Sequence, residues 1–177
     1  MSLTEELKNI ISTATCDADV RERYQKRLPA GNLTRDENNQ SHFCAYFLPY
    51  NPHTGEIFLV HHKKAGLWLS PGGHIDRGEN LLTTLNREIE EELGVAKSFQ
   101  KLPQPFLLSI TPIQNTTQPC KEHFDVWFLF QTDGKNFQIN PREFHDTKWA
   151  APNYAKSILT DAANLKAMDF AREMRRD

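Results

Sequence analysis

The segment from Gly73 to Val95 constrains this chain more than any other part of its sequence. It reads G-H-I-D-R-G-E-N-L-L-T-T-L-N-R-E-I-E-E-E-L-G-V and contains six carboxylates together with two arginines. The acidic residues are Asp76, Glu79, Glu88, Glu90, Glu91 and Glu92. Carboxylates gathered this densely repel one another unless positive charge lies among them. The segment therefore indicates a site that binds a cation.

The same segment has the periodicity of an amphipathic helix. Its apolar residues recur at positions 82, 85, 89 and 93, which is the spacing of one helical face. Asn80 suits the N-cap position, and Gly94 suits a left-handed C-cap. We therefore predict a helix from Leu81 to Leu93.

Three glutamates share one flank of this predicted helix. At about 100° per residue, Glu88, Glu91 and Glu92 fall together beside the apolar stripe, whereas Glu90 points elsewhere. Like charges at this spacing cost about 0.2–0.5 kcal/mol per pair, and Arg87 can neutralise only part of the repulsion. Oxygen ligands without a neighbouring cysteine or paired histidine favour Mg²⁺ or Mn²⁺ over zinc. Taken alone, the glutamate run also suits an exposed acidic helix face.

The full pattern resembles the Nudix box, G-x5-E-x7-R-E-U-x-E-E-x-G-U, in which U is a bulky aliphatic residue. The chain meets every specified position, with Gly73, Glu79, Arg87, Glu88, Ile89, Glu91, Glu92, Gly94 and Val95. Specified residues at so many fixed spacings make a chance match very unlikely. By its sequence the chain is therefore similar to the Nudix hydrolase family, and this resemblance outweighs the exposed-face interpretation.

The resemblance implies a fold, a reaction and a metal site. The fold is an α/β/α sandwich with a mixed β-sheet and a loop–helix–loop metal site. The reaction is divalent-metal-dependent hydrolysis of the pyrophosphate bond in a nucleoside diphosphate linked to another moiety. The substrate classes left open are nucleoside triphosphates, NDP-sugars and ADP-ribose-like compounds. The residues matching the family's metal ligands are Glu88, Glu91, Glu92 and, through its carbonyl, Gly72.

The resemblance also assigns supporting and proton-transfer roles. Arg87 is expected to orient the helix glutamates, and Glu79 is expected to support the metal site. The general base varies within the family, so several candidates stay open. They are Glu88 and Glu91 within the box, and Glu143 and Glu122 downstream of it. The downstream acids have a simpler interpretation as exposed loop residues.

Substrate contacts are less well determined by the sequence. The candidates, chosen for charge or aromatic character near the box, are His61, His62, Lys63, Lys64, Trp68, His74 and His123. The cationic run 61–64 equally suits an exposed hairpin end. The core is the favoured place for Trp68, which lies between Leu67 and Leu69, and a lone histidine is more often structural.

Composition excludes several other classes of protein. The 177 residues suit one domain, with 23 acidic against 21 basic residues and a net charge of −2. This balance does not favour a long nucleic acid or an anionic membrane as partner. No signal peptide or apolar stretch of about 18 residues is present, so we expect a cytoplasmic protein. Cys16, Cys44 and Cys120 form no C-x-x-C pair, so neither a disulfide framework nor a zinc site is indicated.

The rest of the chain divides into an arm and a domain. Residues 1–40 read as an N-terminal helical arm and connector, with amphipathic helices over residues 3–28 that suit a homodimer contact. Residues 41–177 read as the Nudix hydrolase domain. Its predicted strands are 42–50, 56–62, 106–111 and 124–131, and its closing helices lie within 154–175.

Two other functions within the family remain open. One is a non-catalytic sensor of a nucleotide or ADP-ribose-type ligand, which would have an altered box or a further DNA-binding domain. The other is an isomerase of the isopentenyl-diphosphate type, which would use a catalytic cysteine. The regular box favours the hydrolase over both.

Overall fold

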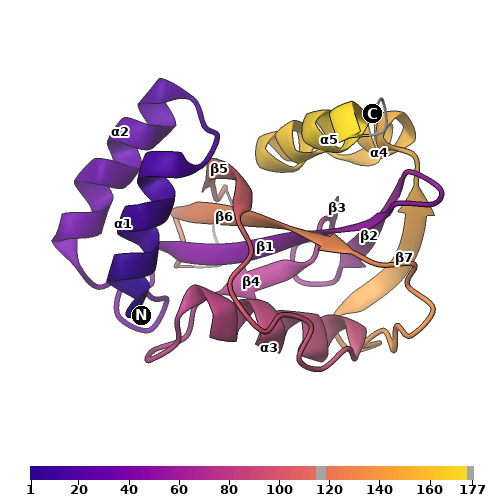
Figure 1. Ribbon diagram of the computed structural model, residues 1–177, viewed down its shortest axis with the longest axis horizontal. Coiled ribbons are helices and arrows are strands. Elements are labelled where there is room, and N and C mark those ends of the chain that lie inside the picture. The colour runs from indigo at the N-terminus through magenta and orange to yellow at the C-terminus, as the bar shows by residue number, and fades with distance from the viewer. Residues whose placement is uncertain (115–118, 175–177) are drawn as a thin grey trace.

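A seven-stranded mixed sheet lies between two layers of helices in the computed structural model, which describes residues 1–114 and 119–174. The strands are β1 (Ser41–Asn51), β2 (Glu56–His62), β3 (Leu67–Leu69), β4 (Gly72–His74), β5 (Pro105–Pro112), β6 (Glu122–Gln131) and β7 (Phe144–Ala150). The helices are α1 (Leu3–Thr13), α2 (Ala18–Arg27), the short 3₁₀ helix η1 (Leu28–Ala30), α3 (Leu81–Leu93), α4 (Pro152–Ile158) and α5 (Ala162–Met174). Helix α3 covers one face of the sheet, and α4 and α5 cover the other (Figure 1). The predicted α/β sandwich is confirmed.

Strand β1 is the centre of the sheet, whose order is β3-β2-β1-β6-β5. It runs parallel to β6 along ten residue pairs, from Ser41 opposite Glu122 to Tyr50 opposite Gln131. Strand β2 pairs with β1 only at the hairpin end, so β4 occupies the rest of that edge of β1. The glycine-rich strand β4 therefore lies in the middle of the sheet, directly above α3 in Figure 1.

Helix α3 has the predicted boundaries, and both of its ends are capped as expected. The Asn80 side chain accepts a hydrogen bond from the Thr83 backbone N–H, and Gly94 has a left-handed backbone with φ of 71°. Its buried face differs from the prediction at one position. Leu82 is only half-buried, whereas Leu81 is fully buried in the core that the arm shares, and its N–H donates to the buried Glu6 carboxylate of α1.

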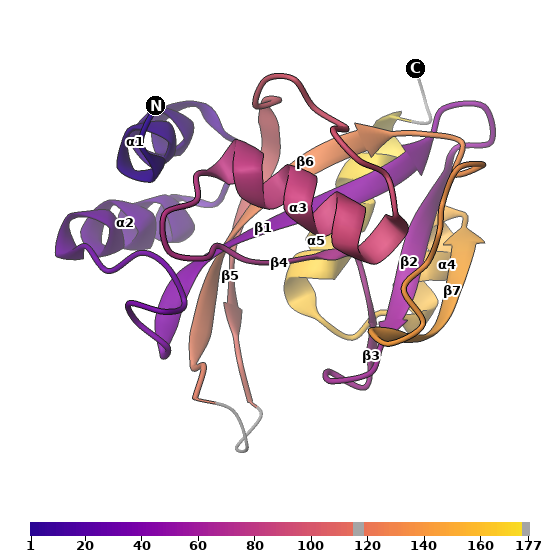
Figure 2. The ribbon, with the colours of Figure 1, turned by 90° about the horizontal axis from the view of Figure 1, so that it is seen from below.

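The N-terminal arm shares its hydrophobic core with the rest of the chain. Helices α1 and α2 lie beside α3 (Figure 2). The fully buried Tyr24 of α2 packs edge-on against Phe43 and Phe124, and its hydroxyl donates to the backbone carbonyls of Ser109 and Asp125 at 3.0 and 2.8 Å. The apolar face that suggested a homodimer contact is thus buried within its own chain. The homodimer stays a prediction that light scattering tests.

The remaining elements match the sequence prediction unevenly. The four predicted strands are present, and two closing helices are found, of which α4 begins at Pro152, before the predicted region 154–175; residue 175 lies outside the described residues. Strands β3, β4 and β7 were not predicted. Two of them have only three residues, and β7 reads F-H-D-T-K-W-A, without the apolar alternation of a half-buried strand.

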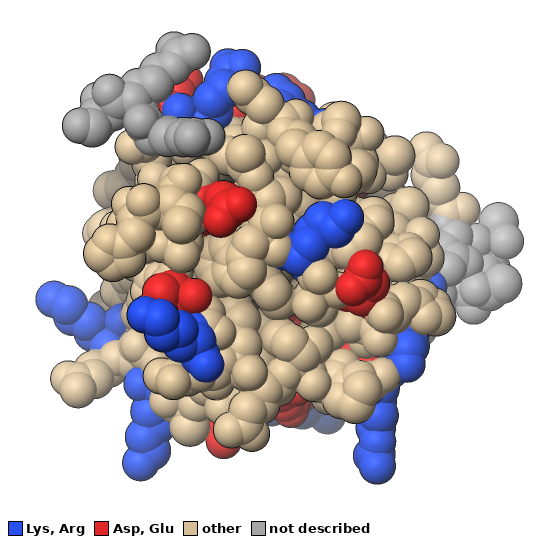
Figure 3. Space-filling model, turned by 90° about the vertical axis from the view of Figure 1, so that its right-hand side faces the viewer, with Lys and Arg blue, Asp and Glu red and all other residues tan. Residues whose placement is uncertain are grey.

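The charged residues of the molecule are mixed in sign. On the face shown in Figure 3, lysines and arginines are interspersed with acidic residues among a majority of uncharged ones. This distribution agrees with the balance of 23 acidic and 21 basic residues. Within residues 1–114 and 119–174, no helix has the length and apolar character needed to cross a membrane.

The buried arm predicts a large effect of a single substitution in α1. Leu7 is fully buried, so Leu7→Ala should lower the free energy of unfolding by about 2–5 kcal/mol, as expected for a leucine in a shared core. Urea denaturation followed by circular dichroism measures this change. Lys8→Ala, at the exposed neighbouring position, should change it by less than about 0.5 kcal/mol. A loss below about 1 kcal/mol for Leu7→Ala would mean that the arm is not part of the cooperative core.

Candidate metal and pyrophosphate site

Two consecutive glycines of β4 allow the acidic side of α3 to approach the sheet. The Gly72 N–H donates to Oε2 of Glu92 at 2.8 Å. A Cβ atom on Gly72 would lie 2.5 Å from the Ala45 carbonyl oxygen, and its φ of 135° is itself unfavourable for other residues. A Cβ atom on Gly73 would clash with the Glu88 carboxylate. Gly73 therefore leaves the space that the Glu88 carboxylate occupies, and Gly72 lets β4 lie close to β1 while its N–H binds Glu92.

Arg87 connects the acidic residues of the box. Its Nε and Nη2 atoms donate to the two oxygens of Glu79 at 2.8 and 3.0 Å. Its Nη1 atom donates to Glu88 at 2.8 Å and to Glu91 at 3.0 Å, and Nη2 also donates to the His74 carbonyl at 2.9 Å. A guanidinium has five N–H donors in a rigid plane, so this one side chain sets the positions of three carboxylates and of β4.

Glu79 anchors the loop before α3. Its carboxylate accepts hydrogen bonds from the Thr84 hydroxyl at 2.7 Å and from the Asp76 N–H at 3.2 Å, in addition to the two from Arg87. Burial opposes ionisation, but the hydrogen bonds from Arg87 and Thr84 outweigh burial and lower the pKa of Glu79. Glu79 is therefore a charged residue that holds Arg87 in place.

Glu88 and Glu92 have the opposite electrostatic character. Burial raises the pKa of Glu88 to about 7, against the opposing effect of Arg87. Burial also raises the pKa of Glu92 well above its usual range, and the nearby charge of Glu88 adds to this shift. Two buried neighbouring carboxylates need more positive charge than Arg87 supplies. This oxygen-only donor set suits Mg²⁺ or Mn²⁺, so the residues present fit the divalent metal that the box implies.

The third glutamate of the set, Glu91, has a more exposed side chain, at 57%. Among the described residues, the groups of three or more donor side chains whose ligand atoms all lie within 4.8 Å of one another do not include Glu88, Glu91 and Glu92. Glu91 instead faces Arg87 Nη1, the atom that also contacts Glu88. Because its side chain is exposed, Glu91 can rotate toward a bound ion without disturbing the core.

The loop before β7 places one downstream acid near the metal helix. Asn140 donates from its N–H to the Glu92 carbonyl at 3.1 Å and from its side chain to the Glu91 carbonyl at 3.2 Å. This contact holds the 140–143 loop against the C-terminal end of α3. Burial, the charge of Glu88 and then the charge of Glu143 raise the pKa of Glu92, and Glu143 Oε2 lies 3.8 Å from Lys64 Nζ.

The other downstream acid, Glu122, lies at the start of β6. It forms an ion pair with Arg23 of α2 and accepts a hydrogen bond from the Ser41 hydroxyl at 3.0 Å. Its carboxylate therefore joins the arm to the sheet. Of the two downstream candidates for the general base, Glu143 has the surroundings that suit the role.

The cationic run 61–64 spans the end of β2 and the turn into β3. Lys63 donates from Nζ to the Pro141 carbonyl at 2.5 Å, and Lys64 Nζ lies 3.8 Å from Glu143 Oε2. Nδ1 of the His62 ring accepts hydrogen bonds from the backbone N–H groups of Lys64 and Ala65 in the turn that follows β2. Both lysines therefore contact the loop that carries Glu143.

Trp68 and His61 form a separate aromatic group on this side of the sheet. Their rings stack with centroids 5.2 Å apart, and Lys148 Nζ lies 4.8 Å from the Trp68 ring centroid. Trp68 is half-buried, so it is not a full core residue, and His61 stacks on its ring.

His74 and His123 lie in a different part of the site from the lysines. Their Nε2 atoms are 3.3 Å apart, and both rings pack against His42. The sequence analysis did not single out His42 or Asn140. His42 and His123 lie in strands that are far apart in the sequence, and only the register of β1 with β6 brings them together.

Comparisons with known proteins agree on one family. A family model described as "NUDIX domain" matches residues 40–170. The "m7GpppN-mRNA hydrolase NUDT17" of Xenopus laevis is 28% identical over 103 residues, which are 52% of this chain and 34% of the relative. The "Nucleoside triphosphatase NudI" of Escherichia fergusonii is 27% identical over 107 residues, which are 59% of this chain and 76% of the relative. The match thus spans only about a third of the mRNA hydrolase.

A solved structure gives the same fold. A NUDIX-family hydrolase from Clostridium perfringens superposes with a TM-score of 0.58 and 19% sequence identity. The superposition covers 75% of this chain and 97% of that one. At 19% sequence identity this likeness shows a shared fold and carries no statement about substrate.

The close approach of Gly73 to Glu88 predicts a local effect on metal binding. Gly73→Ala should push the Glu88 carboxylate out of its position and weaken Mn²⁺ binding at least tenfold, about 1.4 kcal/mol. Isothermal titration calorimetry measures the affinity. Gly66→Ala is the matched control, since a Cβ atom there meets nothing within 4 Å, and its Mn²⁺ affinity should equal that of the unaltered protein. Unchanged affinity in Gly73→Ala would remove Glu88 from the metal ligands.

Proposed function

This chain belongs to the NUDIX family, and we propose that it is a divalent-metal-dependent hydrolase of the pyrophosphate bond in a nucleoside diphosphate linked to another moiety. The observation that carries the proposal is the pair of buried carboxylates, Glu88 and Glu92, packed against the glycines of β4. Folding places these two carboxylates where a divalent metal ion would offset their charge and could also hold a pyrophosphate. A structural role alone gives no reason to bury two neighbouring carboxylates.

We assign the residues of the site as follows. Glu88, Glu91 and Glu92, with the Gly72 carbonyl, hold Mg²⁺ or Mn²⁺. When bound, the ion lowers the pKa of water and neutralises charge on the pyrophosphate oxygens. Arg87 positions Glu88 and Glu91, and Glu79 holds Arg87 through paired hydrogen bonds.

Glu143 is our choice for the general base that accepts a proton from the attacking water. The 140–143 loop is attached to α3 through Asn140, so Glu143 has a defined position beside the helix glutamates. Lys64 Nζ lies 3.8 Å from its carboxylate, so a cation neighbours the proposed base. Glu88 and Glu91 are assigned as metal ligands in this scheme.

The proposed substrate is a small nucleotide. The name of one relative, a nucleoside triphosphatase, makes nucleoside triphosphates the first class to test, followed by NDP-sugars and ADP-ribose-like compounds. A cytoplasmic location is part of the proposal. The isomerase alternative has less support, because burial raises the pKa of Cys44 well above its usual range and disfavours a reactive thiolate. A ligand sensor differs from the hydrolase in having no turnover.

The first test is phosphate release, coupled to an added phosphatase. The substrates are nucleoside triphosphates, NDP-sugars, ADP-ribose, NADH and dinucleoside polyphosphates, each with Mg²⁺, Mn²⁺ or EDTA. We expect turnover of one class, which EDTA abolishes. Absence of turnover with Mn²⁺ binding intact would contradict the hydrolase and favour the sensor.

Glu92→Gln tests the metal ligands within the same assay. The carboxamide introduced by this substitution can still accept the hydrogen bond from Gly72 and keeps the shape of the buried side chain, but it removes the charge. We expect kcat/KM to fall at least a hundredfold, about 2.7 kcal/mol, with no loss of stability in thermal melting. Glu90→Gln, at an exposed position of the same helix, should keep full activity. Full activity in Glu92→Gln would overturn the site assignment.

Glu143→Gln tests the assignment of the general base. It should lower kcat by about 10²–10⁴-fold while KM and Mn²⁺ affinity stay close to those of the unaltered protein. Glu122→Gln is the control, because Glu122 contacts Arg23 and Ser41 and should keep its activity. The reverse pattern in steady-state kinetics would make Glu122 the base, and equal loss in both variants would point to a structural cause.

A further inference from the structure

Four side chains outside the carboxylate site offer one ligand atom each at a common point. His42 of β1, His74 of β4, His123 of β6 and Cys120 before β6 have donor atoms that all lie within 4.8 Å of one another. The strand registers explain why the histidines meet. His42 is opposite His123, and His74 is opposite Cys44, two residues after His42 on the same face of β1.

The separations within this group suit a tetrahedral metal ion. The Nε2 atoms of His74 and His123 are 3.3 Å apart. Two zinc–nitrogen bonds of about 2.0–2.1 Å at a tetrahedral angle place their nitrogens about 3.3–3.4 Å apart. Cys120 Sγ lies 4.0 Å from His42 Nε2, slightly beyond the separation expected for one sulfur and one nitrogen ligand. Small side-chain rotations would bring all four atoms to bonding distance.

Hydrogen bonding leaves the right atoms of these rings free. Nδ1 of His42 lies 2.9 Å from the Asn38 carbonyl oxygen, which requires a proton on Nδ1 and leaves the lone pair on Nε2, toward Cys120. A backbone carbonyl that accepts from the second ring nitrogen is the usual support of a metal-binding histidine. Within the described part of the chain, the buried Nδ1 of His123 has no hydrogen-bond partner. Because Nδ1 has no partner, no hydrogen bond fixes the tautomer of His123, and its Nε2 lone pair is available beside that of His74.

We propose that His42, His74, His123 and Cys120 bind one Zn²⁺ ion at a site separate from the carboxylate site. Imidazole nitrogen and thiolate sulfur are zinc ligands, whereas Mg²⁺ and Mn²⁺ prefer carboxylate oxygen. His42, His123 and Cys120 are buried, and burial favours neutral imidazole over imidazolium. Four protein ligands complete a tetrahedral shell, which is typical of a structural rather than a catalytic zinc site.

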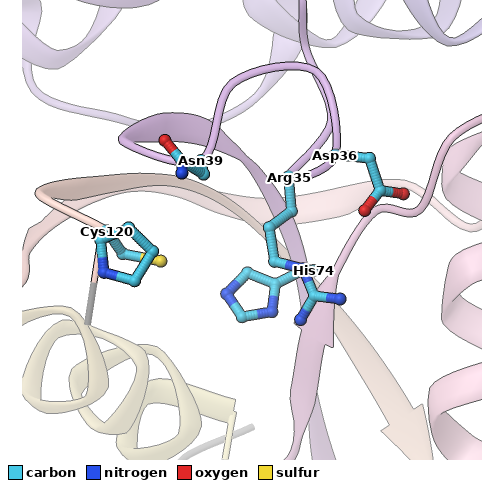
Figure 4. A pocket seen from close by; sticks show the side chains of 6 residues that line it. Arg35, Asp36, Asn39, His74 and Cys120 are labelled. Atoms are coloured by element: carbon cyan, nitrogen blue, oxygen red, sulfur yellow. The ribbon is translucent and has the colours of Figure 1, made fainter. Parts of the chain in front are cut away.

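An opening to solvent gives the ion a path to this site. A cavity of about 420 Å³ reaches His74 and Cys120 and is also lined by Arg35, Asp36 and Asn39. Figure 4 shows the sulfur of Cys120 directed toward the His74 ring at this cavity. The cavity is distinct from the space between Gly73 and Glu88, which lies across the sheet on the side of α3.

The proposed ion would stabilise the strand that carries the glycine pair. His74 directly follows Gly72 and Gly73, and its carbonyl accepts the hydrogen bond from Arg87. Zinc at the His74 ring would join β4 to β1 and β6 through side chains, where β4 is only three residues long. The inference goes beyond the proposed hydrolysis, since zinc binding does not require turnover.

Zinc binding by the untagged full chain tests the proposal. The protein is treated with a strong chelator, exchanged into chelator-free buffer, and given Zn²⁺. Its metal content is then measured by mass spectrometry and its thermal melting is recorded. We expect one Zn²⁺ per chain, retained through gel filtration, and a higher melting temperature than without zinc. No retained zinc in the folded, reduced protein would overturn the proposal.

Cobalt substitution identifies the ligands independently of stability. Co²⁺ in place of Zn²⁺ should give the intense visible bands of a tetrahedral ion and a near-ultraviolet thiolate-to-cobalt charge-transfer band. Cys120→Ser should lose the charge-transfer band, whereas Cys16→Ser, in the arm, should keep it. His42→Gln should lose retained zinc, and Glu92→Gln should keep it because the carboxylate site is separate. Unchanged cobalt spectra in Cys120→Ser, or zinc lost in Glu92→Gln alone, would contradict the site.

Discussion

The hydrogen bonds of Arg87 organise the acidic side of this molecule. One guanidinium contacts Glu79, Glu88 and Glu91 and also the backbone of β4 through His74. Without it, the loop before α3, the helix itself and the glycine strand would be joined only by packing and a few hydrogen bonds, such as those from Thr84 to Glu79 and from Gly72 to Glu92, while their carboxylates repel. The raised pKa values of Glu88 and Glu92 indicate that even this arrangement leaves the site short of positive charge. A divalent ion would supply that charge, so the same interaction supports both the fold and the proposed chemistry.

Strand β4 depends on this arrangement and in turn joins the two candidate metal sites. The Gly72 N–H binds Glu92, and Gly73 has no side chain, so α3 can bring the Glu88 carboxylate close to the sheet. The next residue, His74, directs its ring to the histidine and cysteine group. A change in the position of this three-residue strand would therefore move ligands at both sites. This coupling gives a physical reason for a structural ion beside a catalytic one.

The sequence predicted those features that depend on residues close together in the chain. Helix α3 was predicted with its boundaries because apolar spacing and both caps are local signals. The burial of Leu81 in place of Leu82 was missed, since the start of the helix packs in a core shared with the arm, which is distant in the sequence. The histidine and cysteine group was missed for the same reason, and the absence of a C-x-x-C pair argued against zinc. Its ligands come from residues 42, 74, 120 and 123, which only the register of three strands brings together.

Donor chemistry is what keeps two such closely spaced metal sites distinct. The carboxylate site offers only oxygen, and its Glu91 side chain is exposed, which suits a weakly held, exchangeable Mg²⁺ or Mn²⁺ whose shell a substrate completes. The proposed zinc site offers nitrogen and sulfur, and three of its four residues are buried. Zinc would still compete for the carboxylates if the softer ligands were removed, because affinity for divalent ions rises from Mn²⁺ toward zinc at most sites. At limiting zinc the histidine and cysteine group would fill before the carboxylates, because nitrogen and sulfur ligands bind zinc more tightly than oxygen alone.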